Sequence, residues 1–138
     1  MRLTISRALV PILALTAAFG LSCGSSLETT AQTKGREYTS RFYDGDLAAL
    51  HQLFTQETAQ EIPFAQFTEM RRVVTEQLGR ETEVLFERVE FKAPYYRYLR
   101  RVRFERHVGE IEINWLLRGD DQRIAGVVFS PVPTPGQG

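Results

Sequence analysis

Residues 35–78 carry apolar side chains at the spacing of α-helices, with one such residue at about every third or fourth position. Tyr38 and Phe42 stand one turn apart, and the Asp-Gly-Asp sequence at residues 44–46 supplies a stop for this helix and a cap for the next. A further apolar stripe begins after Pro63. The pattern therefore predicts three helices in the first half of the chain.

Beyond residue 79 the periodicity changes to that of β-strands, because Val, Ile, Phe and Tyr become dense and alternate with polar residues. Such alternation is typical of antiparallel strands with one buried face. We expect four strands, over residues 83–92, 95–106, 109–118 and 123–130. Together the two halves predict an α+β fold in which three N-terminal helices pack on a curved four-stranded antiparallel sheet.

The two ends of the chain differ from this middle part. Residues 1–22 begin with a basic stretch, continue as an apolar run and contain no acidic residue, which is typical of a signal peptide. The apolar run of about 14 residues is shorter than the roughly 20 that span a bilayer. We therefore expect cleavage after residue 22, a single domain over residues 35–131 and a disordered, proline-rich tail over residues 132–138.

The chain contains a single cysteine, so no internal disulfide can form. The residues around Ser22 and Cys23 resemble the box of bacterial lipoproteins, in which the cysteine receives a lipid. The resemblance implies a membrane anchor on Cys23 and export to the cell envelope. It also implies the outer membrane, if the organism has one, because Gly24 stands where inner-membrane retention signals have Asp. Residues 23–34, rich in Ser, Thr and Gln, would then be the lipidated cysteine and a flexible tether.

Ordinary signal cleavage near the same position is the alternative to lipidation.

The charge of the chain excludes one class of partner. The chain has 17 basic and 17 acidic residues, and the two kinds alternate along the sequence. A nucleic-acid-binding protein normally has a dominant basic surface. We therefore expect no nucleic-acid partner.

Reactive side chains offer little sign of catalysis. The aspartates fall at predicted turns, and the strand glutamates mostly alternate with apolar residues, as on a solvated face. Glu87 is the strongest candidate for an inward carboxylate because it shares its strand face with Leu85 and Val89. His51 and His107 lack the short spacing of metal ligands. The sequence thus predicts no catalytic residue, no metal site and no cofactor.

Aromatic residues of neighbouring strands form the best candidate for a binding site. If the sheet curves, these rings converge on the helical layer. They then either fill the core, where burial stabilises by about 1.5–3 kcal/mol each, or line a partly filled hollow that takes an apolar ligand. Both interpretations stay open at this point. The residues are Tyr96, Tyr98, Phe104, Trp115 and Phe129.

The order of these elements resembles that of a bacterial family, domain of unknown function 3887, within the nuclear transport factor 2-like superfamily. The resemblance covers residues 36–131 and implies a cone-shaped roll in which a curved sheet wraps a long helix. It implies no activity, because superfamily members include enzymes, binding modules and dimerisation domains. The resemblance is based on Phe42, Gly45, Asp46, Leu53 and Phe54 in the first half, and on Leu78, Gly79, Ile124, Gly126 and Pro131 in the second.

Two functions are compatible with these observations. The first is a noncatalytic envelope lipoprotein domain that binds a small apolar ligand or a protein partner, or forms a homodimer through the open face of its sheet. The second is a cavity enzyme or lipid-handling protein of the ketosteroid isomerase or polyketide cyclase type. An inward carboxylate in an apolar cavity would favour the second function.

Overall fold

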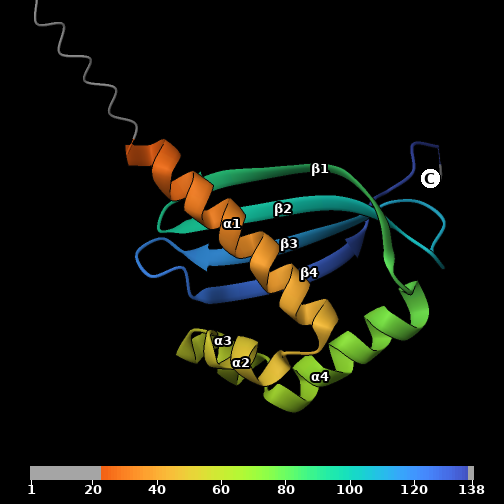
Figure 1. Cartoon of the computed structure of the whole chain (residues 1–138), viewed down its shortest axis with the longest axis horizontal. Helices are drawn as coiled ribbons and strands as arrows, with labels where there is room; N and C mark the ends of the chain where they lie inside the picture. The colour runs from red at the N-terminus through yellow and green to blue at the C-terminus, as the bar shows by residue number, and fades with distance from the viewer. Residues whose placement is uncertain (1–22, 137–138) are drawn as a thin grey trace, which may run out of the picture.

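The computed structural model describes residues 23–136, which fold into an α+β arrangement with a four-stranded antiparallel sheet (Figure 1). This confirms the predicted fold class. The described helices are α1 (Cys23–Asp44), α2 (Leu47–Gln52), α3 (Gln56–Glu61) and α4 (Phe64–Val73), which continues into a π-helical turn, η1 (Val74–Leu78). The strands are β1 (Glu81–Lys92), β2 (Tyr95–Phe104), β3 (Ile111–Arg118) and β4 (Ile124–Pro131).

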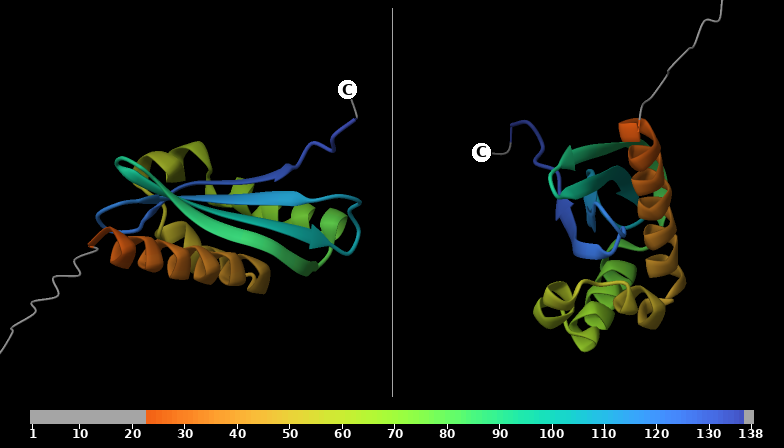
Figure 2. Two further views of the ribbon diagram at one scale, coloured as in Figure 1. Left: turned by 90° about the horizontal axis from the view of Figure 1, so that it is seen from above. Right: turned by 90° about the vertical axis from the view of Figure 1, so that its left-hand side faces the viewer.

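The strands pair in chain order, β1-β2-β3-β4, so that β1 and β4 are the two edges of the sheet. Helix α1 crosses one face of this sheet, and α2, α3 and α4 gather beyond the β4 edge (Figures 1 and 2). We call the face that α1 covers the inner face. Within residues 23–136, none of the helices combines the length and the apolar character that crossing a bilayer requires.

The core lies between α1 and the inner face. Trp115 is fully buried at its centre, and its indole N–H donates a hydrogen bond of 3.0 Å to the Thr39 hydroxyl of α1. The hydroxyl of Tyr38, the residue before Thr39 in α1, donates to the Gln122 carbonyl at 2.9 Å. The phenyl ring of Phe42 packs against that of Phe67 from α4 at 5.6 Å. The core thus joins the first helix, α4 and the sheet into one unit.

The structure corrects the predicted tether, because residues 23–34 form the first half of α1. Two small residues explain why the composition was misleading. Ala31 is completely buried, and the Tyr98 ring packs directly on the backbone of Gly35. The polar residues of this stretch occupy the solvent side of a docked helix. The predicted signal peptide, residues 1–22, lies outside the described residues.

The number of helices is also corrected, since the described chain has four α-helices where three were predicted. An additional helix, α3, follows α2 because Thr55 caps it, accepting a hydrogen bond of 3.2 Å from the Thr58 amide. Between them, Phe54 forms a parallel bridge with Ile124 of β4. The helix predicted after Pro63 begins there, and its π-helical end precedes Gly79, which has a φ of 76°.

The predicted disordered tail lies partly within the described residues. Residues 132–136 follow β4 without forming a helix or strand, and the Val132 amide donates a hydrogen bond of 2.9 Å to the Glu110 carbonyl. Residues 137–138 lie outside the described part of the chain.

Candidate ligand groove

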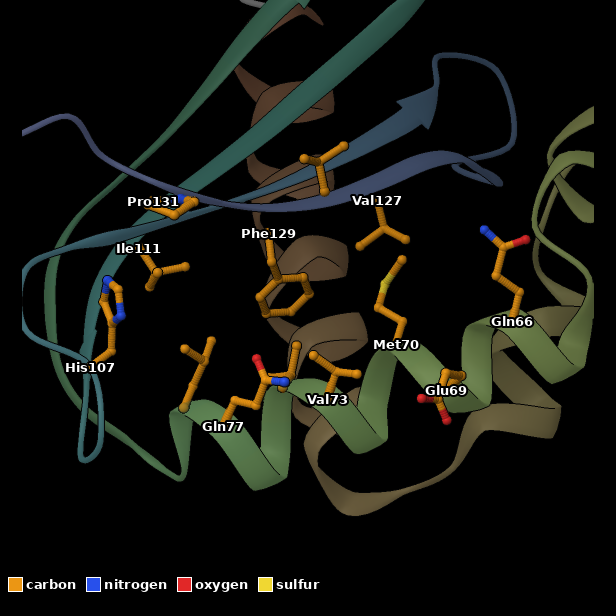
Figure 3. A pocket seen from close by; sticks show the side chains of 13 residues that line it. Gln66, Glu69, Met70, Val73, Gln77, His107, Ile111, Val127, Phe129 and Pro131 are labelled. Atoms are coloured by element: carbon orange, nitrogen blue, oxygen red, sulfur yellow. The ribbon is translucent and has the colours of Figure 1, made fainter.

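An open groove of about 750 Å³ lies between α4, the π-helical turn and β4 (Figure 3). Met70 from α4 and Val127 from β4 point toward one another across it. Phe129 forms part of its floor, and the Phe129 ring packs 5.1 Å from that of Phe42 on α1. The apolar walls are made by Met70, Val73 and Leu78 on the helical side and by Ile111, Val127 and Phe129 on the strand side.

Polar groups of the groove include Gln66, Glu69, Gln77 and His107. Glu69 is matched by Arg72, with an ion pair of 2.6 Å, and this hydrogen bond lowers the pKa of the Glu69 carboxyl. The groove therefore offers apolar surface together with a few hydrogen-bonding groups, the usual composition of a site for an apolar or amphipathic molecule.

The π-helical turn supplies Val74, Gln77 and Leu78 to this groove. Turns of this kind occur mostly within α-helices and frequently at functional sites. Here the turn carries the end of the helix past β4, so that Leu78 and Met70 line the same groove. Its position supports the groove as the functional part of the described surface.

The sequence-predicted aromatic residues do not all meet in this groove. Phe129 lines it, whereas Tyr96, Tyr98, Phe104 and Trp115 are packed in the core, each no more than 5% exposed. Met70 and Leu78 had been recognised only as part of a helical stripe. That stripe does face the sheet, but these two residues are only partly buried because the helix stands away from β4 at the groove.

Separate from the groove, a cluster of charged and polar side chains lies between α1 and strands β1 and β2. Glu87 of β1 points to the inner face and its side chain is only 12% exposed. It binds Arg36 of α1 at 2.5 Å and Arg100 of β2 at 2.5 Å, and it accepts a hydrogen bond from the Tyr98 hydroxyl. Arg100 also pairs with Glu81.

This cluster is electrostatically balanced. Burial alone would raise the pKa of Glu87, but hydrogen bonds from Arg36, Tyr98 and Arg100 lower it to about 2. Burial raises the pKa of the Tyr98 hydroxyl, and its hydrogen bond to Glu87 adds to the effect. Glu87 is therefore an ionised, fully partnered carboxylate at neutral pH, which does not suit it to act as a general base.

The two histidines lie in different places. His51 is partly buried, where its Nε2 lies 2.9 Å from the Ile62 carbonyl and its ring packs 4.9 Å from that of Phe54. His107 lines the groove. Among residues 23–136, no three His, Cys, Asp or Glu side chains are grouped so that they could hold a metal ion.

Comparisons with protein-family models, with curated proteins and with solved structures find no match for this chain.

Proposed function

We propose that this chain is a noncatalytic binding domain of the bacterial envelope, anchored by a lipid on Cys23, whose groove between α4 and β4 holds an apolar ligand. The observation that carries the proposal is the composition of the groove. Its walls are apolar on both sides, and its acidic group, Glu69, is already paired with Arg72. Such a site gains binding energy from removing apolar surface from water.

The surroundings of Glu87 support a binding role over the alternative of a cavity enzyme. An isomerase-like enzyme needs a carboxylate that faces an open apolar cavity and can take up a proton. Glu87 faces α1 instead, where Arg36 and Arg100 hold it ionised. The groove lining does not include it.

We also propose that the fold is a nuclear transport factor 2-like roll. The arrangement of a long first helix across the inner face of a four-stranded meander supports this assignment (Figure 1). The position of the groove, beside the inner face and backed by Phe42 of α1, agrees with the hollow that such a roll implies.

Titration of the full-length chain with Nile red, a neutral apolar fluorophore, tests the proposed groove. We expect saturable binding that the Val73→Glu substitution weakens by at least about tenfold, because a carboxylate in an apolar wall opposes burial of the dye. The control is Val84→Glu, the same change of side chain on the opposite edge strand, β1, where Val84 is 43% exposed and lies outside the groove. Equal binding by the wild type and the Val73→Glu variant would overturn the proposal, provided that circular dichroism shows both folded.

Metabolic labelling with a clickable fatty acid tests the anchor. We expect the wild-type chain to carry the label and to sediment with membranes, and the Cys23→Ala chain to lose both properties. A Cys23→Ala chain that still takes up the label would contradict lipidation at this residue.

A further inference from the structure

We infer that the ligand of the groove is an extended polypeptide segment, which adds a strand to the free edge of β4 and places alternate apolar side chains in the groove. The inference rests on the proposed function, because it takes the groove as the binding site. It goes further by naming the chemical class of the ligand and the backbone that binds it.

The first observation is that the groove runs along the edge of β4. Val127 and Phe129 belong to the inner face, whereas Val128 lies between them in sequence and points to the opposite face, where it is 54% exposed. All three line the groove. Residues from both faces of one strand border the same groove only where that groove follows the strand edge. In the sheet order, β4 has a partner on one side only, which is β3.

The second observation is that the fold already forms an isolated backbone bridge at this edge, near the start of β4. The Ile124 amide donates a hydrogen bond of 2.8 Å to the Leu53 carbonyl, and the Thr55 amide donates one of 2.8 Å to the Ile124 carbonyl. The residue between, Phe54, forms a parallel bridge with Ile124. The groove continues this interface along the same strand, toward Pro131. Proline has no amide hydrogen, so strand pairing would end there.

The dimensions of the groove agree with a strand. Residues 127–131 of β4, the stretch that lines the groove, span about 14 Å at 3.4 Å per residue. The opposite wall, from Gln66 to Leu78, spans about 18 Å at 1.5 Å per helical residue. A segment of five or six extended residues therefore fills the groove from end to end, with every second side chain against Met70, Val73 and Leu78.

The charges in the groove wall determine which residues the bound segment can have. The Glu69 carboxylate in the groove wall is matched by Arg72, so an additional charge on the ligand would be buried without a partner. The residues of the segment that face the groove are therefore uncharged and apolar. Main-chain hydrogen bonds would supply affinity and the apolar contacts would supply selectivity, as in other cases of strand addition.

The test uses the full-length chain and a pool of seven-residue peptides in which Val, Ile, Leu, Phe or Tyr alternates with Thr. Bound members are identified by affinity selection, and hydrogen–deuterium exchange then follows the amides of β4. We expect retained peptides to slow exchange in residues 124–131 but not in the other edge strand, β1. We also expect N-methylation of alternate peptide amides, which removes hydrogen bonds and keeps the side chains, to weaken binding by at least about tenfold. The Val73→Glu variant should retain none of the peptides.

Four other outcomes overturn the inference. If Nile red binds but no peptide is retained, the groove takes another class of apolar molecule, and the proposed function survives alone. If peptides bind without slower exchange in β4, or if N-methylated and unmodified peptides bind equally, the peptide is not held by strand addition, and the proposed function again survives alone. If neither Nile red nor any peptide binds, the proposed function and the inference both fail.

Discussion

Glu87 lies between two guanidinium groups, and its replacement by glutamine removes the charge that balances them. In the Glu87→Gln variant, Arg36 regains water easily because its side chain is 56% exposed, whereas Arg100 is only 17% exposed. We therefore expect a loss of about 2–3 kcal/mol in the free energy of unfolding, mostly because Arg100 keeps Glu81 but loses the second of its two carboxylate partners.

Urea unfolding measures this loss, and Glu83→Gln on the same strand is the matched control. The Glu83 side chain is 53% exposed and pairs with Arg103, so its substitution should change the stability by no more than about 0.5 kcal/mol. Similar losses in the two variants would contradict a special role for the cluster beneath α1.

The same carboxyl predicts a pH dependence. Its pKa in the folded chain is about 2, below the ordinary value of 4.5, so folding favours its ionised form. A lowered pKa stabilises the folded state fully above the ordinary value, and this contribution disappears as the pH falls toward the folded value. The stability difference between wild type and Glu87→Gln should therefore be constant near neutrality and shrink between pH 4.5 and about 2.

Urea unfolding of both proteins across this pH range checks the prediction. Because the other carboxyls titrate in both proteins, the difference isolates Glu87. A difference that grows on acidification would show that the assigned pKa shift has the wrong sign.

At the scale of elements, the packing of α1 on the sheet depends on Gly35, which has no side chain. A Cβ atom at Gly35 would lie 2.2 Å from ring carbons of Tyr98, and that ring is buried with its hydroxyl held by Glu87. Alanine favours a helix by about 1 kcal/mol over glycine, but forcing α1 away from the sheet costs about 1–3 kcal/mol.

We expect Gly35→Ala to lower the free energy of unfolding by up to about 2 kcal/mol, the difference between these two effects, measured by urea unfolding. Ser40→Ala, at an exposed position on the same helix, is the control and should be neutral or slightly stabilising. A Gly35→Ala variant more stable than the wild type would show that α1 can shift without loss of packing.

The elements also show what the sequence could reveal. Strand alternation placed Trp115 on the buried face, and Pro63 and Gly79 marked the ends of the third predicted helix, because these signals are local. The first half of α1 was missed because its contacts use Ala31 and Gly35, which no hydrophobic pattern reveals.

Neither the polar cluster around Glu87 nor the apolar groove could be identified without the tertiary structure. Arg100 alternates with Tyr98 and Val102, so the strand periodicity places it on the inner face, although a charged side chain normally stays in solvent. Only Glu81 and Glu87, brought beside it by the pairing of β1 and β2, make a half-buried arginine stable there. The groove likewise depends on the spacing between α4 and β4, which the order of residues does not determine.

At the scale of the whole molecule, the core predicts that unfolding is a single cooperative event. The buried cluster includes residues of α1, α2, α4, β2, β3 and β4, and the partly buried Val89 of β1 packs against it, so α1 has no separate core that would let it unfold alone. Trp115 is the single tryptophan of the chain, is fully buried, and donates to Thr39 while packing 5.8 Å from the Tyr38 ring. Its fluorescence therefore reports the contact between α1 and the sheet.

We expect urea unfolding followed by Trp115 fluorescence and by far-ultraviolet circular dichroism to give coincident transitions, as a two-state domain requires. The Thr39→Val variant keeps the volume of the side chain but removes the acceptor for the indole N–H. We expect it to lower the free energy of unfolding by about 1–2 kcal/mol, so that both transitions move together to lower urea concentration. A fluorescence change that precedes the loss of helix would mean that α1 separates from the sheet while both remain folded. The sheet would then be stable without α1, contrary to a core that the two share.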